Sequence, residues 1–387
     1  MQTASGFSFL VCQRYKKRRH STIAMKADQI KPVLEKAILA PSADNMQPWK
    51  FRLSDDGVDL FLTKNRDPHL LEVGLKSLYV SVGAVIENIR VAALHHGYRA
   101  IPSHFPEGQD PTFVARIRFE TSPIHEHPHY FALEQRATNR KFYNLSRQIN
   151  DAIYQKLRET VEQSAAANQI SSQSYRLVWI KRKNPGYRPL CRMISFADQL
   201  RYESPKIHRE FMETVRFSKA ETESTCDGLD IRTFEAGPCA PVLFNLIRSW
   251  PRLRLLNWLG LSRMFNFYSW LQLMSSQAIG LLVGPTHSNA DYINGGETME
   301  RLWHEITLQG LAIQPMMALP IFLLCRVLNY DQGFGQEQNA KLDQLQREFI
   351  SLFGITKDNA LIFLFRMGYA KSPTARSLRR PLESFLL

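Results

Sequence analysis

The alternation of apolar and polar positions is clearest from residue 49 onward. Trp49, Phe51 and Leu53 alternate with polar residues, which is the period of a strand with one buried face. The stretch before it, PSADNMQPW (41–49), contains two prolines, a serine and two side-chain amides, residue types that shape turns. The pattern predicts a loop that enters a strand. Such a loop either presents amide groups to a ligand or is an ordinary capped turn.

A helical period occurs twice, in two segments that resemble one another. Residues 82–98 (VGAVIENIRVAALHHGY) align with residues 295–311 (GGETMERLWHEITLQGL). Each copy has two glycines fourteen positions apart, which are Gly83 and Gly97, and Gly296 and Gly310. Because glycine is common at helix ends, we predict in each copy a helix that begins after the first glycine and stops at the second.

The flanking segments also match. The stretch from Asp110 (DPTFVARIRF) resembles the stretch from Asp358 (DNALIFLFRM) as a later strand, and a helical pattern at 29–39 has a counterpart at 148–164. A repeat of this size predicts two copies of one α+β unit, packed about a pseudo-twofold axis as in a homodimer.

The unequal lengths of the copies determine the predicted domain organisation. The second copy is roughly 90 residues longer than the first before its glycine-bracketed helix, and loops that long are usually lids, binding elements or linkers. We expect a basic tail at 1–25, a first unit at 26–130 and a second unit at 131–387, with a lid-like insertion at about 183–275.

Composition and charge narrow the function classes. The chain has 387 residues, of which 44% are hydrophobic and 22% charged, as in a packed globular protein. Its 49 Lys+Arg exceed its 36 Asp+Glu by 13, which suits anionic ligands, nucleic acid or an anionic membrane surface. The five cysteines form no CxxC pair and no zinc-spaced cluster, so we expect a reducing, cytoplasmic compartment and no metal.

No run of 18 apolar residues occurs, and we therefore expect no transmembrane helix. The nearest approach is 241–275, which mixes four arginines with tryptophan, phenylalanine and tyrosine residues. Such a basic, aromatic segment is a membrane-surface element, a pocket cover or a pair of core helices. We favour the core or cover interpretations and keep peripheral membrane contact as an alternative.

Two motifs carry a resemblance to a known family. The loop at 41–49 matches the pattern P-S-x-x-N-x-Q-P-W, and the pattern R-x-[S/T]-x-[R/K]-x-F is present as Arg136, Thr138, Arg140 and Phe142. With these motifs the chain resembles the nitroreductase-like flavoprotein superfamily, and within it the Acg-type branch, in which two nitroreductase units are fused in one chain. The likeness covers most of the chain beyond the basic tail.

Two further segments fit this resemblance. The stretch YINGGE (292–297) resembles the family's glycine-rich entry to the long helix, whose backbone groups face the flavin ring. In the C-terminal arm, Arg379 matches the phosphate-binding arginine, assisted by Arg376 or Arg380. The lysine that the family places two positions before that arginine is Ser377 here, a departure that weakens the phosphate site unless Arg376 compensates.

The resemblance implies one FMN per chain, in the seam between the two units. Arginine forks suit its phosphate, and the loop of the first unit would cover its ring. A second site is not expected, because SAAANQISSQSYRLVWI, the stretch that should repeat the loop, lacks its prolines. The residues assigned to the cofactor are Pro41, Ser42, Ala43, Asn45, Gln47, Arg136, Thr138, Arg140, Asn294, Gly295, Gly296, Arg376 and Arg379.

The implied activity is that of an FMN-dependent oxidoreductase, which transfers hydride or electrons between NAD(P)H and a small conjugated acceptor of the nitro, quinone or enone class. We assign no catalytic side chain, because the flavin itself carries the hydride. The alternatives are a protein that stores or senses FMN under a closed lid with little turnover, and a basic membrane-peripheral or nucleic-acid-associated module. We expect a monomer or weak homodimer and no nucleic-acid partner.

Overall fold

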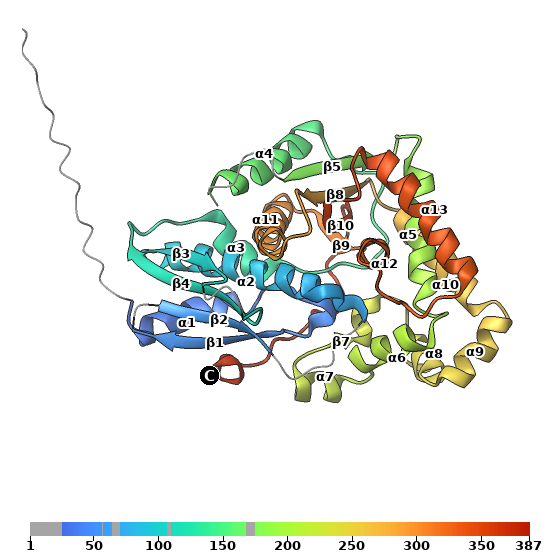
Figure 1. Cartoon of the computed structure of the whole chain (residues 1–387), viewed down its shortest axis with the longest axis horizontal. Coiled ribbons are helices and arrows are strands. Elements are labelled where there is room, and N and C mark those ends of the chain that lie inside the picture. The colour runs from blue at the N-terminus through green and yellow to red at the C-terminus, as the bar shows by residue number, and fades with distance from the viewer. Residues whose placement is uncertain (1–24, 56, 64–69, 107–109, 168–174) are drawn as a thin grey trace, which may run out of the picture.

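The computed structural model describes residues 25–387, apart from 56, 64–69, 107–109 and 168–174 (Figure 1). The predicted basic tail at 1–25 therefore lies outside the described residues except for Met25. The described strands are β1 (Trp49–Ser54), β2 (Gly57–Leu62), β3 (Tyr98–His104), β4 (Phe113–Thr121), β5 (Arg176–Lys181), β6 (Val215–Arg216), β7 (Leu229–Asp230), β8 (Ala278–Gly284), β9 (Ala312–Pro315) and β10 (Ala360–Gly368).

Helices and strands alternate in an α+β arrangement, which confirms the predicted class. The described α-helices are α1 (Ala27–Ala37), α2 (Lys76–His95), α3 (Pro128–Gln135), α4 (Asp151–Ala167), α5 (Tyr187–Leu200), α6 (Pro205–Thr214), α7 (Lys219–Thr225), α8 (Ala240–Ile247), α9 (Trp250–Trp258), α10 (Leu261–Met274), α11 (Asn289–Leu308), α12 (Ala318–Val327) and α13 (Gln336–Phe353). The short 3₁₀ segments are η1 (Ala43–Asn45), η2 (Leu70–Leu75), η3 (Ile231–Phe234) and η4 (Leu382–Phe385).

Two four-stranded antiparallel sheets form the framework. Their orders are β1-β2-β4-β3 and β5-β8-β10-β9. Counted along the chain, each sheet places its first strand beside its second, then its fourth and its third. The predicted alternation in β1 is confirmed, since Trp49 and Phe51 are fully buried and Arg52 is exposed.

Helices α2 and α11 lie between the two sheets and pack on one another (Figure 1). Both are 20 residues long. The predicted ends are confirmed, because Gly97 and Gly310 follow the two helices with φ of 79° and 66°, the left-handed values that glycine adopts readily. The predicted starts were wrong: Gly83 and Gly296 lie inside the helices.

The two interior glycines allow a close helix crossing. A Cβ on Gly83 would lie 2.1 Å from the carbonyl oxygen of Ile293, and a Cβ on Gly296 would lie 2.1 Å from that of Val80. Each glycine thus faces the residue three positions before the other, so the contact is symmetric about the crossing point. Only a residue without a side chain permits this approach.

Ion pairs also join α2 to α11. Arg301 Nε lies 2.7 Å from Glu87 Oε1, and Arg90 binds Glu297 at 2.6 Å. Both carboxylates are buried, and a buried carboxylate is costly unless it is paired. Removal of one partner would leave such a charge uncompensated.

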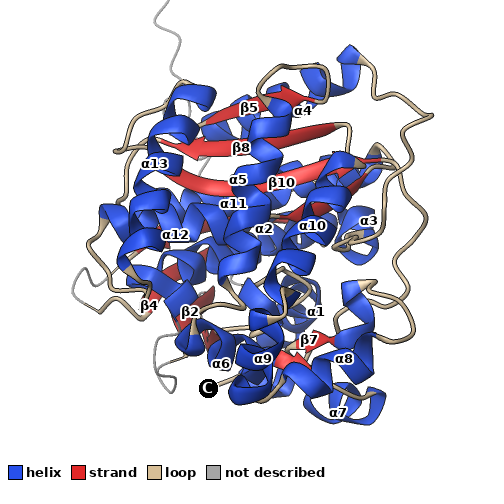
Figure 2. Cartoon of the chain, turned by 90° about the vertical axis from the view of Figure 1, so that its right-hand side faces the viewer, coloured by secondary structure: helices blue, strands red, loops and turns tan. Residues whose placement is uncertain are grey.

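Two long segments extend the second sheet. Residues 182–277, between β5 and β8, contain α5 to α10, although β5 and β8 are paired neighbours. Figure 2 shows β5, β8 and β10 side by side, with helices packed over them. A second segment, with α12 and α13, separates β9 from β10. The alignment of the two internal repeats did not predict these two helices. Part of the first segment has a core of its own, built around Phe211, Phe244 and Leu253.

The helix of residues 73–95 is long and apolar enough to cross a membrane by length and composition. It is mostly buried inside the protein, and its α2 portion is the central helix described above. The nearest approach to a membrane span is therefore this helix, and the prediction that it lies at 241–275 was wrong. Packing against α11 explains the apolar character of this helix.

The C-terminal arm crosses to the first sheet. After β10 the chain runs along the surface, and its last residues lie beside β1 (Figure 1), where Leu387 N donates to Phe51 O at 2.9 Å. The arm therefore brings residues 375–380 next to the loop at 41–49.

Candidate functional site

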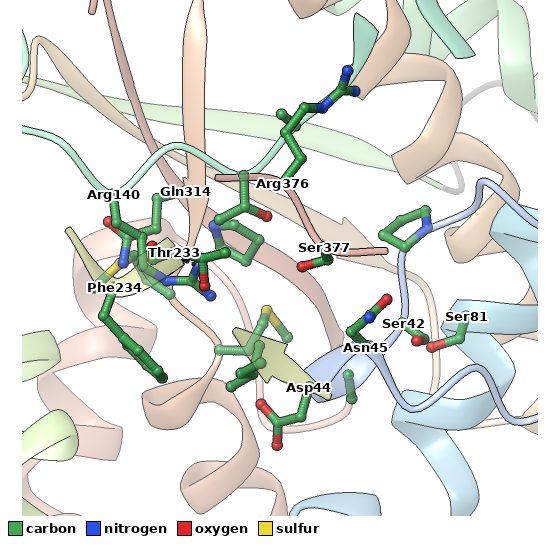
Figure 3. Close-up of a pocket in the computed structure, with 18 of the residues that line it drawn as sticks. Ser42, Asp44, Asn45, Ser81, Arg140, Thr233, Phe234, Gln314, Arg376 and Ser377 are labelled. Atoms are coloured by element: carbon green, nitrogen blue, oxygen red, sulfur yellow. Dashed lines mark hydrogen bonds between the residues drawn. The ribbon is translucent and has the colours of Figure 1, made fainter. Parts of the chain in front are cut away.

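A cavity of about 750 Å³ lies where several separate segments meet. Its lining comes from the loop at 41–45, the stretch 136–140, the arm at 375–379, the stretch 314–317 at the end of β9, and helices α8 and α10. This volume is typical of a small-molecule or cofactor site. Figure 3 shows Arg140 and Asn45 approaching from opposite sides.

The loop at 41–49 is held in an unusual backbone conformation. Asp44, Asn45 and Gln47 have φ of 47°, 57° and 51°, a region that side chains other than Asn and Asp adopt rarely. Ser42 Oγ accepts a hydrogen bond from Gln47 N at 2.9 Å. The predicted residues Pro41, Ser42, Ala43 and Asn45 all line the cavity.

Asn45 ties the loop to the arm. Its Nδ2 donates to the carbonyl oxygens of Leu378 and Gly228 at 3.0 and 3.1 Å, and its Oδ1 accepts from Arg379 at 2.7 Å. The side chain is buried and all of its polar atoms are used. Asn45 therefore positions Arg379 as well as the loop.

Gln47 lies outside the cavity lining, and its assignment to the cofactor is corrected here. It is fully buried. Its Nε2 donates to Cys226 O at 2.9 Å, and its Oε1 accepts from Arg380 N at 3.0 Å. The amide fastens the loop to the arm, so it has no free group for a ligand.

Arg136 lines the cavity with its charge already balanced. Its Nε lies 3.0 Å from Glu300 Oε1 of α11, it donates to Leu39 O at 2.6 Å, and its guanidinium lies 4.7 Å from the Trp303 ring centroid. Because this ion pair is buried, the charge of Arg136 already serves to compensate the charge of Glu300 and stabilises the fold. Arg136 can support an anion site but is not its main free charge.

Arg379 is balanced only in part, by the charge of Glu300, with which it forms no ion pair. Its guanidinium donates to the carbonyl oxygens of Ile38, Leu39 and Ala40 at 3.1, 3.0 and 3.0 Å, and it forms no ion pair with a carboxylate of the described residues. Burial, followed by the nearby charge of Arg136, lowers the pKa of Arg379 to about 9. An anion at this position would restore the ordinary preference for the charged form.

Arg376 lies beside it. It donates to the carbonyl oxygens of Arg136, at 2.6 Å, and Glu134. Burial and then the charge of Arg136 lower the pKa of Arg376 as well. Arg136, Arg376 and Arg379 therefore form one cationic group, which is electrostatically under-compensated.

Arg140 belongs to a second cationic group. It donates to Thr233 O at 3.2 Å, and its guanidinium lies 5.5 Å from the Phe234 ring centroid. Burial lowers the pKa of Arg140 to about 10, and the charge of Arg201 adds to this. Arg136, Arg140 and Arg379, all three assigned to the cofactor from the sequence, line the same cavity. Arg140 lies across it from Asn45, the partner of Arg379 (Figure 3).

The glycine-rich stretch at 292–297 is part of α11, not a loop, and none of its residues lines the cavity. The assignment of Asn294, Gly295 and Gly296 to the cofactor is therefore corrected. Gly296 serves the helix crossing, and a Cβ on Gly295 would lie 2.7 Å from Ile362 Cδ1. Close packing explains both glycines.

Sequence reasoning missed the stretch Gln314–Met317, which forms the end of β9 and the two residues after it and lines the cavity. Gln314 is held by Arg366, whose Nε donates to its Oε1 at 2.6 Å. Thr138, which was predicted, lies on the same side, since it bridges to Ile313. Apolar lining comes from Trp303, Met316, Met317, Ile362, Phe363, Phe234 and Tyr268.

Comparison with known proteins gives two kinds of match. No protein-family model matches the chain. The "Uncharacterized protein MT1398" of Mycobacterium tuberculosis (strain CDC 1551 / Oshkosh) is 28% identical over 367 residues, which are 90% of this chain and 47% of that protein. The "Putative NAD(P)H nitroreductase acg" of M. tuberculosis is 36% identical over 92 residues, 24% of this chain and 28% of its own length.

This chain is similar to Acg-type proteins. The resemblance inferred from the motifs is thereby confirmed, over about a quarter of the chain. The chain spans about half the length of the first relative and matches little more than a quarter of the Acg protein. The likeness to the Acg-type protein is therefore a local one.

Solved structures give looser likenesses. The FMN and NADPH-dependent nitroreductase NfnB from sphigopyxis sp. strain HMH covers 66% of this chain at 14% identity and a TM-score of 0.38, with 96% of its own chain matched. NfnB from Mycobacterium smegmatis, solved with NADPH, covers 66% of this chain and 96% of its own at 12% identity and a TM-score of 0.39. Both TM-scores are below 0.5, so we infer nothing from these two likenesses.

Proposed function

We propose that this chain binds one FMN in the cavity and is an oxidoreductase of the nitroreductase type, which moves hydride or electrons from NAD(P)H to a small conjugated acceptor of the nitro, quinone or enone class. The observation that carries the proposal is the meeting of the loop at 41–45, Arg136 and the arm arginines at one cavity with an apolar wall. The local similarity to a protein named as an NAD(P)H nitroreductase supports it.

The donor set fits FMN, a flat apolar ring with a dianionic tail. Arg376 and Arg379 would hold the phosphate, because neither forms an ion pair with a carboxylate of the described residues and guanidinium forks suit phosphate. Met316, Met317 and Trp303 would contact the ring. FMN would supply the redox chemistry, accepting and delivering a hydride at its ring.

The side chains of the site have positioning roles in this proposal. Asn45 holds Arg379 and the loop in place, Arg366 holds Gln314, and the apolar wall excludes water from the ring. The proposal needs no general acid or base from the protein. No side chain is therefore given a catalytic role, and the residues that line the cavity would bind the cofactor.

We propose, further, that the chain is a pseudo-dimer of two nitroreductase-like units, at 26–130 and 131–387, with the insertion at about 183–275 acting as a lid. The shared strand order of the two sheets and the symmetric crossing of α2 and α11 support the duplication. Helices α8 and α10 line the cavity, as a lid would. A monomer or weak homodimer in the cytoplasm fits this organisation.

A visible spectrum followed by anaerobic titration with NADPH and NADH tests the proposal. We expect flavin absorbance near 450 nm, which bleaches with a nicotinamide nucleotide and returns on adding a quinone or nitroaromatic compound. A protein that stays yellow with both nucleotides yet bleaches with dithionite would overturn the reductase activity. A colourless protein that gains no visible absorbance with FMN would overturn the flavin site itself.

A further inference from the structure

Helices α8 to α10 carry an unusual concentration of exposed apolar side chains. Seven of the sixteen large apolar side chains that are exposed in the described part of the chain lie within 26 consecutive residues. Trp258 is 82% exposed, and Val242 74%. We call this set the α8–α10 patch: Val242, Leu246, Leu255, Trp258, Leu259, Met264 and Phe267. Exposed apolar groups that are gathered in this way mark interaction sites.

The patch is built on three consecutive helices at the edge of the molecule. Figure 1 shows α8 and α9 at the outer margin, away from both sheets. Within α9 and its C-terminus, Leu255, Trp258 and Leu259 are three and four positions apart, the spacing that places side chains on one face of a helix. Met264 and Phe267 repeat this spacing on α10.

Positive charge dominates this region. Arg252, Arg254 and Arg263 are exposed and form no hydrogen bond or ion pair with the described residues. The sequence has no Asp or Glu between residues 236 and 290. Glu203 also lines the groove between α9 and α10, where it accepts from Gln199 at 2.6 Å and Gln338 at 3.2 Å and keeps its negative charge. Arg254 and Arg263 outweigh this single carboxylate in the groove lining.

The groove itself combines cationic and aromatic groups. It has a volume of about 490 Å³, and Arg254 and Arg263 line it together with Trp250 and Trp258. Tryptophan is enriched where protein meets the headgroup layer of a bilayer, and arginine lies there with its stem among apolar groups and its charge at phosphate.

We propose that the α8–α10 patch docks on the surface of an anionic lipid bilayer. Trp258, Leu259 and Phe267 would enter the headgroup–acyl boundary, and the three arginines would contact lipid phosphates. The charge argues for this occupant, because three unpaired cations in an acid-free stretch match an anionic lipid surface. Docking would also bury the exposed apolar side chains, so it would account for both the apolar side chains and the unpaired arginines.

The patch and the cavity share their helices. Phe244 of α8, and Phe265 and Tyr268 of α10, line the cavity from the inner side. Docking would therefore place the proposed lid against the bilayer, where an apolar acceptor is concentrated. The docking proposal does not depend on FMN, and its test needs none.

Vesicle co-sedimentation of the full chain tests the proposal. We expect the protein to sediment with vesicles of phosphatidylcholine and phosphatidylglycerol in equal parts, to stay in solution with phosphatidylcholine alone, and to be released by salt. The variant Arg252→Gln, Arg254→Gln, Arg263→Gln should bind on the order of 100-fold more weakly. Replacing Trp258 and Leu259 by serine should weaken binding without changing its salt dependence.

A matched variant controls for net charge. Arg158, Arg176 and Arg347 are exposed on other elements, and replacing all three with glutamine removes the same charge away from the patch. Retained binding of this variant would support the proposal, and equal loss in both triple variants would overturn it. No binding to anionic vesicles, or self-association through the patch without lipid binding, would overturn it as well.

Discussion

Arg379 is a cation that the protein surrounds with carbonyl oxygens, and it makes no ion pair with the described residues. Its hydrogen bonds satisfy the donors but leave the net charge in place. Burial, and then the charge of Arg136, lower its pKa to about 9, because the site disfavours a bare charge. A bound phosphate would reverse this penalty, so in the proposed FMN site Arg379 should be the residue on which the preference for a phosphorylated flavin depends most.

Burial also disfavours the charged form of His127, and the pKa of this side chain lies in a pH range where unfolding can be measured. It is the N-cap of α3, where its Nδ1 accepts from His129 N at 3.2 Å. Burial, and then the neighbouring His129, lower the pKa of His127 to about 4. The neutral ring is the one that can accept this hydrogen bond, and protonation would remove the cap.

We predict that His127 contributes to acid sensitivity. Between pH 6.5 and about 4 the unfolded chain takes up a proton at His127 that the folded chain does not, so the free energy of unfolding falls as pH falls through this window. Asparagine caps helices without titrating. In His127→Asn, urea unfolding at pH 7 and pH 5 should therefore differ by about 1 kcal/mol less than in the wild type, after allowance for solvent screening.

His125→Asn is the control for this comparison, because His125 is exposed two positions away and caps no helix. It should keep most of the pH dependence of the wild type, because the charge of His125 is the smallest of the causes that lower the pKa of His127. A His127→Asn variant with an unchanged difference between the two pH values would show that the cap does not titrate as described.

At the level of elements, the crossing of α2 and α11 is the contact most sensitive to side-chain size. We predict that Gly83→Ala and Gly296→Ala each destabilise the protein by at least about 2 kcal/mol, because each new methyl would lie 2.1 Å from a carbonyl oxygen and the helices would have to separate. Propensity alone predicts the opposite sign, since alanine is favoured over glycine inside a helix by about 1 kcal/mol. Chemical unfolding measures which effect wins.

Gly335→Ala is a suitable control. Gly335 has a φ of −70°, and the nearest atom to a new Cβ would be Gln338 Oε1 at 3.8 Å. Its substitution should change stability by no more than about 0.5 kcal/mol. Stabilisation by Gly83→Ala would refute the close crossing.

The same glycines explain which elements the sequence predicts. Gly97 and Gly310 end their helices as expected, because a left-handed residue after a helix is a local requirement. In the sequence, Gly83 and Gly296 cannot be told apart from Gly97 and Gly310. Glycine is required at Gly83 and Gly296 because the neighbouring helix leaves no space for a side chain. The alternation in β1 predicted a strand for a similarly local reason, since Trp49 and Phe51 face one core.

At the level of the molecule, the sequence predicts those parts of the candidate site that come from one continuous motif. The loop at 41–45 and the two arm arginines were assigned from sequence, and they reach the cavity. Gln314 and Met317 were missed, because only the folding of β9 beside β10 brings them there. The pairing of Arg136 with Glu300, 164 positions away, is also invisible in a linear pattern.

The two sheets, the central helix pair and the crossing arm together make one cavity out of distant segments. The arm leaves the second sheet and ends on the first, so it fastens the two halves beside the site. Arg380 serves this fastening through Gln47, whereas Arg379 faces the cavity. Both arginines fasten the arm, since Arg379 also donates to Leu39 O and Ala40 O, and under the proposed function only Arg379 would in addition contact the ligand.

Titration of the apoprotein with FMN and with riboflavin, which lacks the phosphate, tests the central claim most directly. We predict one FMN per chain, bound roughly 100-fold more tightly than riboflavin because of charge-assisted hydrogen bonds to the phosphate. Arg379→Gln should remove most of that difference, and Arg380→Gln should leave it. Equal affinity for FMN and riboflavin, or no binding of either, would contradict the account.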